Sequence, residues 1–229
     1  MQYQCEAVSV EGFIQQLAVA YVSRGYLFYV TGEIPPGKDP ARVDAKLVER
    51  YGVGLSQWAR ARRKQAGRAN VQYLRHGRFF VLLATHGEHP FFEAEGDRVR
   101  DARRRSIKYS GYAVGFRGGH VQVRIDRPRY RELKAWFEEE ATRRSAERLA
   151  KAFYDLPFEP YALVRRQEFD LLRAVNRCRS AAGLPLVPKA CIWLKRRPVK
   201  PFGEGGPAAE PSPIRGRRGR ASGTGFGGL

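Results

Sequence analysis

Two pairs of apolar runs, each joined by a glycine turn, constrain the fold of this chain more than any other feature. In the first pair, residues 71–75 and 78–85 flank His76-Gly77, a dipeptide suited to a tight turn. Residues 79–83 of the second run are all apolar, as expected of a strand that is buried on both faces. The first pair therefore predicts a β-hairpin with an interior strand.

The second pair predicts another hairpin with a different pattern. Residues 107–117 form one expected strand, and two glycines join it to an expected strand over 120–125. Apolar and polar residues alternate in the latter, and its polar set is His120, Gln122 and Arg124. Since successive side chains of a strand point to opposite faces, we expect one face of this strand to be buried and the other to be open.

Helix signals surround the hairpins. The expected helices cover residues 10–22, 39–51, 56–67, 128–156 and 165–182, and further strands are expected at 26–31 and 191–194. In the helix that starts at Ser56, Trp58 is expected to turn inward. The pattern predicts an α+β fold with a mainly antiparallel sheet and helices packed on one face, of which the ferredoxin-like arrangement is one form.

The domain organisation follows from composition. Residues 1–202 carry the apolar periodicity and are expected to form a single domain, whereas residues 203–229 are rich in Gly, Pro and Arg and are expected to be a disordered tail. No apolar run reaches the roughly 18 residues of a membrane helix. Three scattered cysteines without C-x-x-C spacing argue against a disulfide framework and a zinc site, and favour the cytoplasm.

Charge gives the main functional signal. The chain has 42 Lys and Arg residues against 23 Asp and Glu residues, a formal net charge of +19. Such a surface attracts polyanions, and nucleic acid, DNA or RNA, is the expected partner. An alternative explanation is that the composition of the genome favours arginine codons. Such a bias exchanges Lys for Arg but leaves the number of acidic residues unchanged, so it does not account for the net charge.

The basic residues are clustered, and we expect the clusters to contact phosphates. The candidate nucleic-acid-binding residues are Arg60, Arg62, Arg63, Lys64 and Arg68 in a first run, Arg103, Arg104 and Arg105 in a second, and Lys195, Arg196 and Arg197 in a third. Asp97 and Asp101 lie close to the second run and can pair with its arginines, which makes this run a weaker candidate for phosphate contact. For each run, the alternative interpretation is that the basic side chains only face solvent and bind no ligand. The first run is the best single candidate.

A loop after the first hairpin contains His86 and His89 close to several glutamates. Imidazole and carboxylate are ligands for divalent ions, so the two histidines are a candidate metal site. The alternative is structural, since a loop histidine often caps an element. Their spacing is not that of a metalloprotease helix.

The strand segment His120-Val121-Gln122 resembles the His-hydrophobic-His motif of rolling-circle replication initiators and single-tyrosine transposases, with Gln in place of the second His. Tyr130 and Lys134 are similar to the Tyr-x-x-Lys motif of that family, one residue longer. The resemblance implies a divalent metal, Mg²⁺ or Mn²⁺, that polarises a phosphate, and a tyrosine that attacks it. The alternative is that His120 and Gln122 line a sheet face while Tyr130 packs in the core.

The glycine-rich segment at residues 219–227 resembles the C-terminal loop of CRISPR repeat-processing endoribonucleases, whose fold is also ferredoxin-like and basic. Low-complexity composition explains these glycines equally. No phosphate-binding loop and no serine nucleophile motif is present.

The sequence therefore predicts a basic nucleic-acid-binding protein, associated with a mobile element or a ribonucleoprotein. The alternative from the enzyme class is a metal-dependent single-strand nuclease, transposase or replication initiator that uses a tyrosine nucleophile. Tyr26, Tyr29, Tyr109, Tyr112 and Phe116 lie on expected strands, where exposed rings stack on unpaired bases. Because most strand aromatics belong to a core, we expect at most two of them to be exposed.

Overall fold

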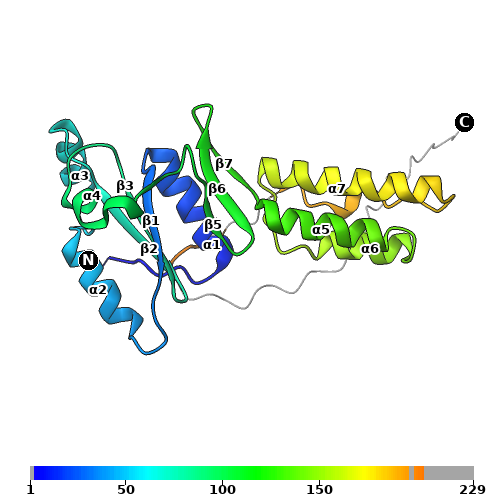
Figure 1. The fold of residues 1–229 in the computed structure, drawn as a ribbon, viewed down its shortest axis with the longest axis horizontal. Coiled ribbons are helices and arrows are strands. Elements are labelled where there is room, and N and C mark those ends of the chain that lie inside the picture. Colours follow the sequence, from blue (N-terminus) through cyan, green and yellow to red (C-terminus); the bar gives the residue numbers. More distant parts are fainter. Residues whose placement is uncertain (1–2, 196–198, 204–229) are drawn as a thin grey trace, which may run out of the picture.

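The computed structural model describes residues 3–195 and 199–203. It is an α+β fold with two antiparallel sheets (Figure 1). The four-stranded sheet has the order β2-β3-β1-β4, and the three-stranded sheet has the order β5-β6-β7. The strands are β1 (Phe28–Glu33), β2 (Val71–His76), β3 (Phe79–Ala84), β4 (Arg100–Asp101), β5 (Ile107–Tyr109), β6 (Tyr112–Arg117) and β7 (His120–Ile125).

The helices come before, between and after these strands. They are α1 (Val10–Gln15), α2 (Pro40–Arg50), α3 (Gln57–Gln65), α4 (Pro90–Glu95), α5 (Arg127–Glu140), α6 (Ala146–Tyr154) and α7 (Ala162–Ala181). A π-helical segment (Gln16–Tyr21) and a 3-10 turn (Val22–Arg24) continue α1, so the expected helix over 10–22 is confirmed. No helix in the described ranges is long and apolar enough to cross a membrane.

The first hairpin forms as the sequence predicts. β2 and β3 pair from Val71↔Ala84 to His76↔Phe79, and Gly77 makes the turn with a φ of 57°. β1 pairs with the other edge of β3, which makes β3 an interior strand. Its apolar sequence matches this position, since Val81, Leu82 and Leu83 are all buried.

The second hairpin has one strand more than expected. Residues 107–117 were expected as a single strand, but Ser110 and Gly111 both have positive φ, 44° and 78°. Two consecutive residues of this kind form the tight turn of a hairpin, so the segment folds back on itself as β5 and β6. β7 then pairs with β6 as expected, from Arg117↔His120 to Tyr112↔Ile125.

An aromatic cluster joins the two sheets. Figure 1 shows α1 lying between them, and Phe13 of α1 contacts Phe79 of the first sheet (5.9 Å between ring centroids) and Tyr109 of the second (4.7 Å). The Tyr109 ring also stacks on Phe79 at 4.4 Å, and its hydroxyl lies 2.6 Å from Nδ1 of His76. These rings hold the turn end of the β2–β3 hairpin against the second sheet.

The C-terminal half of the described chain is helical, with two corrections to the expected elements. The helix expected over 128–156 is two helices, because the chain breaks after Ala141 and Ser145 caps α6 by accepting from the Arg148 amide (3.3 Å). Because the apolar stripe continues through both helices, the sequence pattern did not indicate the break between them. The strand expected over 191–194 is absent from the described structure, which has a 3-10 turn at Lys189–Cys191 instead.

Candidate nucleic-acid interface

Several loops meet at one end of the four-stranded sheet. The register places Phe28, Ala84 and Val71 side by side on β1, β3 and β2, and Asp101 of β4 beside Phe28. The segments that enter or leave these strands, 66–70, 85–89 and 102–106, therefore lie at the same sheet end. Two of them are joined directly, because the Ala69 amide donates to the Glu88 carbonyl (3.0 Å) and the Glu88 amide donates to the Gly67 carbonyl (3.1 Å).

Helix α3 lies at this end and carries the first basic run. Ser56 caps it by accepting from the Ala59 amide (3.2 Å). The side chain of Arg60 donates to the Leu55 carbonyl, and that of Arg63 donates to the Ala69 carbonyl (3.2 Å). These contacts join the helix to the segments just before and just after it through arginines rather than through an apolar face, and no residue of α3 is buried. A carbonyl is neutral, so both guanidinium charges stay uncompensated.

The other basic residues of this run point into solvent. Arg62, Lys64 and Arg68 are exposed. Among the described residues, no carboxylate forms an ion pair with any of the five basic side chains of the run. We call α3 together with 66–70 and 102–106 the basic end.

Trp58 is exposed, and the expectation that it turns inward is wrong. Its exposed fraction is 82%. Arg60 and Arg63 are half-buried and bonded to the Leu55 and Ala69 carbonyls, and at about 100° per residue Trp58 lies about 200° around the helix from Arg60. The arginine contacts thus direct the indole outward, where it is an open aromatic surface among unpaired cations.

The second basic run lies at the same sheet end but at the opposite edge, on the strand β4. β4 pairs Arg100 and Asp101 with β1, and the chain then passes Phe28. Arg103 is partly neutralised, since its Nη2 lies 2.7 Å from Oδ2 of Asp101, and its guanidinium covers the Phe28 ring at 5.6 Å. This hydrogen-bonded arginine lowers the pKa of Asp101 below its ordinary value. Arg104 and Arg105 are exposed and have no ion pair within the described ranges.

The third basic run is not at this end. Lys195 is exposed next to Leu194, whose carbonyl accepts from Arg165 of α7 (2.8 Å). In Figure 1, α7 and α3 lie at opposite ends of the molecule. Arg196, Arg197 and the basic tail lie outside the described residues.

The histidines of the candidate metal site do not act together. Nδ1 of His89 accepts from the Phe91 amide (3.0 Å) and caps α4, and burial lowers the pKa of this ring, which favours the neutral form that can accept. His86 is exposed, with its ring 6.4 Å from that of Phe28. No group of three or more His, Cys, Asp or Glu side chains in the described part of the chain is placed to hold a metal ion.

The residues of the nuclease hypothesis lie apart. His120 is exposed at the tip of the β6–β7 hairpin, opposite Arg117, and Gln122 is half-buried two residues along. α5 starts beyond the other end of β7, about 17 Å of strand away at 3.3 Å per residue. Tyr130 is half-buried there, with charged residues of α7 nearby, and Lys134 pairs with Glu138 at 3.8 Å. The structure therefore does not bring His120 and Tyr130 together.

The five strand aromatics form no stacking platform. Tyr26, Tyr29 and Tyr112 are buried, and Tyr109 and Phe116 are half-buried. The expectation that at most two would be exposed is confirmed.

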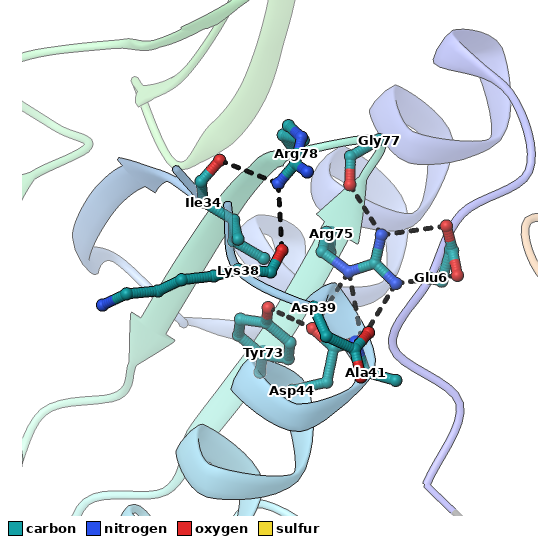
Figure 2. A network of polar contacts seen from close by, with 10 residues as sticks. All are labelled: Glu6, Ile34, Lys38, Asp39, Ala41, Asp44, Tyr73, Arg75, Gly77 and Arg78. Atoms are coloured by element: carbon teal, nitrogen blue, oxygen red, sulfur yellow. Dashed lines mark hydrogen bonds and ion pairs between the residues drawn. The ribbon is translucent and has the colours of Figure 1, made fainter. Parts of the chain in front are cut away.

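Sequence reasoning missed a buried ionic network at the other end of the sheet, near the β2–β3 turn (Figure 2). Nε of Arg75, on β2, donates to Asp44 of α2 (2.9 Å), and its Nη2 donates to Glu6 (2.7 Å). The hydroxyl of Tyr73 also donates to Asp44, at 2.6 Å. The signal was an arginine within an apolar strand, because a buried arginine needs a carboxylate. This network uses the Arg75 charge to join three segments, so it does not present that charge to a ligand.

Neither a model of a known protein family nor a curated protein matches this sequence.

Proposed function

We propose that this protein is a cytoplasmic nucleic-acid-binding protein that binds phosphates through its basic end. The observation that carries the proposal is the set of cations on α3 and 66–70 that has no carboxylate partner in the described structure, together with the exposed Trp58. An unpaired surface arginine or lysine that meets a phosphate releases a condensed counterion, which favours binding.

Single strands are the favoured form of the nucleic acid. Trp58 is exposed on the same short helix as Arg62 and Lys64, so one strand can contact the cations with its backbone while a base stacks on the indole. A duplex keeps its bases stacked inside and offers no such partner to the indole.

The test compares two triple variants that remove the same charge. One is Arg62→Ala, Lys64→Ala and Arg68→Ala, which removes unpaired cations; the other is Arg129→Ala, Arg143→Ala and Arg173→Ala, which removes cations paired with Glu132, Glu139 and Asp170. Binding of labelled single- and double-stranded DNA and RNA is titrated at several salt concentrations. We expect the first variant to reduce the slope of log affinity against log salt by about 2, since each phosphate contact contributes about 0.7–0.9.

The control variant should keep the wild-type slope. If both variants change the slope equally, net charge and not the basic end controls binding. If the wild-type protein binds none of the four polymers, the proposal is wrong.

A further inference from the structure

A polar groove runs beside the basic end. It has a volume of about 460 Å³ and lies between α3, the segment that continues α1, and the first residues of β2. Phe202, close to the last described residue, also lines it. A groove of this size is within the range of small-molecule sites, which begins at about 300 Å³.

The charge of the groove lining is of one sign. Arg24 contributes from the helical segment after α1, and Arg60 and Lys64 contribute from α3. No aspartate or glutamate is among the lining residues. Arg24 and Lys64 are exposed and so stand at the rim, whereas Arg60 is half-buried. The lining thus favours an anionic ligand whose charge stays near the rim.

Asn70 forms part of the floor and has an unsatisfied acceptor. The residue is only 4% exposed. Its amide nitrogen Nδ2 donates to the Arg60 carbonyl (3.0 Å), and a carbonyl can only accept, so this contact fixes which way the side-chain amide is turned. Oδ1 then points elsewhere, and it has no hydrogen-bond partner among the described residues. A buried acceptor without a donor is costly, so the site favours a ligand that offers an N–H or O–H.

Donors stand beside this acceptor. Gln72 is 5% exposed, and its Oε1 accepts from the Tyr3 hydroxyl (2.9 Å). Its Nε2 approaches the Tyr26 hydroxyl only at 3.5 Å, a long contact that leaves this amide able to donate more strongly to a ligand. The floor therefore combines an acceptor on Asn70, just before β2, with a donor on Gln72, the second residue of β2.

We propose that this groove binds one unpaired nucleotide of the strand, with the base edge against Asn70 and Gln72 and its phosphate near Arg24 and Lys64. A nucleobase edge carries N–H donors next to acceptors, and a base reaches such a floor only when it is not paired. The inference rests on the proposed function and specifies the form of nucleic acid that this end of the protein takes.

The experiment uses 15-nucleotide single strands, DNA and RNA, each with a single 2-aminopurine at a chosen position. A base that enters the groove leaves its stacked neighbours, so its fluorescence should change when the wild-type protein binds. A matching strand with an abasic site at the same position should bind about tenfold more weakly, the value of one or two hydrogen bonds. Asn70→Ala should remove this difference between the two strands.

Two further variants keep the test independent of folding. Arg24→Glu reverses an exposed charge of the groove, and Arg117→Glu reverses an exposed charge at the distant hairpin tip. We expect Arg24→Glu to abolish the fluorescence change and Arg117→Glu to retain it. Salt-dependent strand binding without a fluorescence change at any position would overturn the groove assignment and leave the proposed function intact. Absence of all strand binding would overturn both.

Discussion

Two basic regions of the molecule differ in how their charges are matched. Residues 56–68 contain five cationic side chains and no acidic one, whereas residues 127–181 contain thirteen cationic and nine acidic side chains. In the helical region, ion pairs three or four residues apart are frequent, such as Arg143–Glu139 (2.6 Å) and Lys151–Asp155 (2.6 Å). The difference shows that a count of cations does not separate matched from unmatched charge, whereas the positions of the nearby carboxylates do.

The comparison makes opposite predictions for paired and unpaired charges. Removing a paired or buried charge should change stability and leave strand binding alone. Removing an unpaired one should change binding and leave stability alone.

The largest expected effect is on a buried pair. Asp44→Asn should lower the free energy of unfolding by about 3–5 kcal/mol, because Arg75 would remain buried without its main partner. The matched control is Glu6→Gln, whose side chain is 57% exposed and whose loss should cost at most about 1 kcal/mol. Urea denaturation measures both. Neither variant should change the salt dependence of strand binding, and a change in it would break the division between the two kinds of charge.

The next effect concerns a carboxylate in the helical region. Glu168 is 4% exposed, and burial raises its pKa to about 8, although Arg165 opposes the shift. The folded state therefore holds this proton more tightly than the unfolded state, in which the pKa is near 4.5. The contribution of Glu168 to the free energy of unfolding should therefore be largest below pH 4.5. Between pH 4.5 and pH 8 it should fall by up to about 1.4 kcal/mol per pH unit.

Glu168→Gln should remove this slope. Denaturation of the wild type and the variant at pH 6, 7 and 8 measures it. Parallel curves for the two proteins over this range would contradict the assignment of the slope to Glu168.

The smallest expected effects separate two tryptophans. Trp58→Ala should weaken single-strand binding by about 1–3 kcal/mol and leave the free energy of unfolding within about 0.5 kcal/mol of the wild type. Trp136→Ala should lower the free energy of unfolding and leave single-strand binding unchanged, because this indole packs on Phe137 (4.8 Å between ring centroids) and under the Arg144 guanidinium (5.1 Å). Fluorescence anisotropy and urea denaturation measure the two quantities. Equal losses of binding would remove the distinction between the two regions.

The sequence predicted the elements that local chemistry determines. The hairpin over residues 71–85 has both a glycine turn and an apolar interior strand, and α2 has Asp39 as a cap, which accepts from the Ala41 amide at 3.0 Å. The turn at Ser110 was missed because serine seldom adopts positive φ. An apolar stripe that continued through two helices concealed the break before Ser145.

The candidate site was predicted only in part. A run of cations without acids marked α3, and this pattern is visible in the sequence. The outward position of Trp58 was not predicted, since it depends on Arg60 and Arg63 bonding to carbonyls in the loops that flank the helix, contacts that no residue pattern indicates. Asn70 and Gln72 are polar residues near the start of an apolar strand. This pattern is visible in the sequence, but it does not predict the groove that the two residues line.

The most direct measurement is photocrosslinking of the wild-type protein to a single strand with photoreactive bases, followed by mass spectrometry of the attached peptides. We predict that crosslinks fall within residues 56–72 and 100–106, at the sheet end that carries the unpaired cations. Crosslinks confined to residues 127–181, where the charges are paired, would contradict the account.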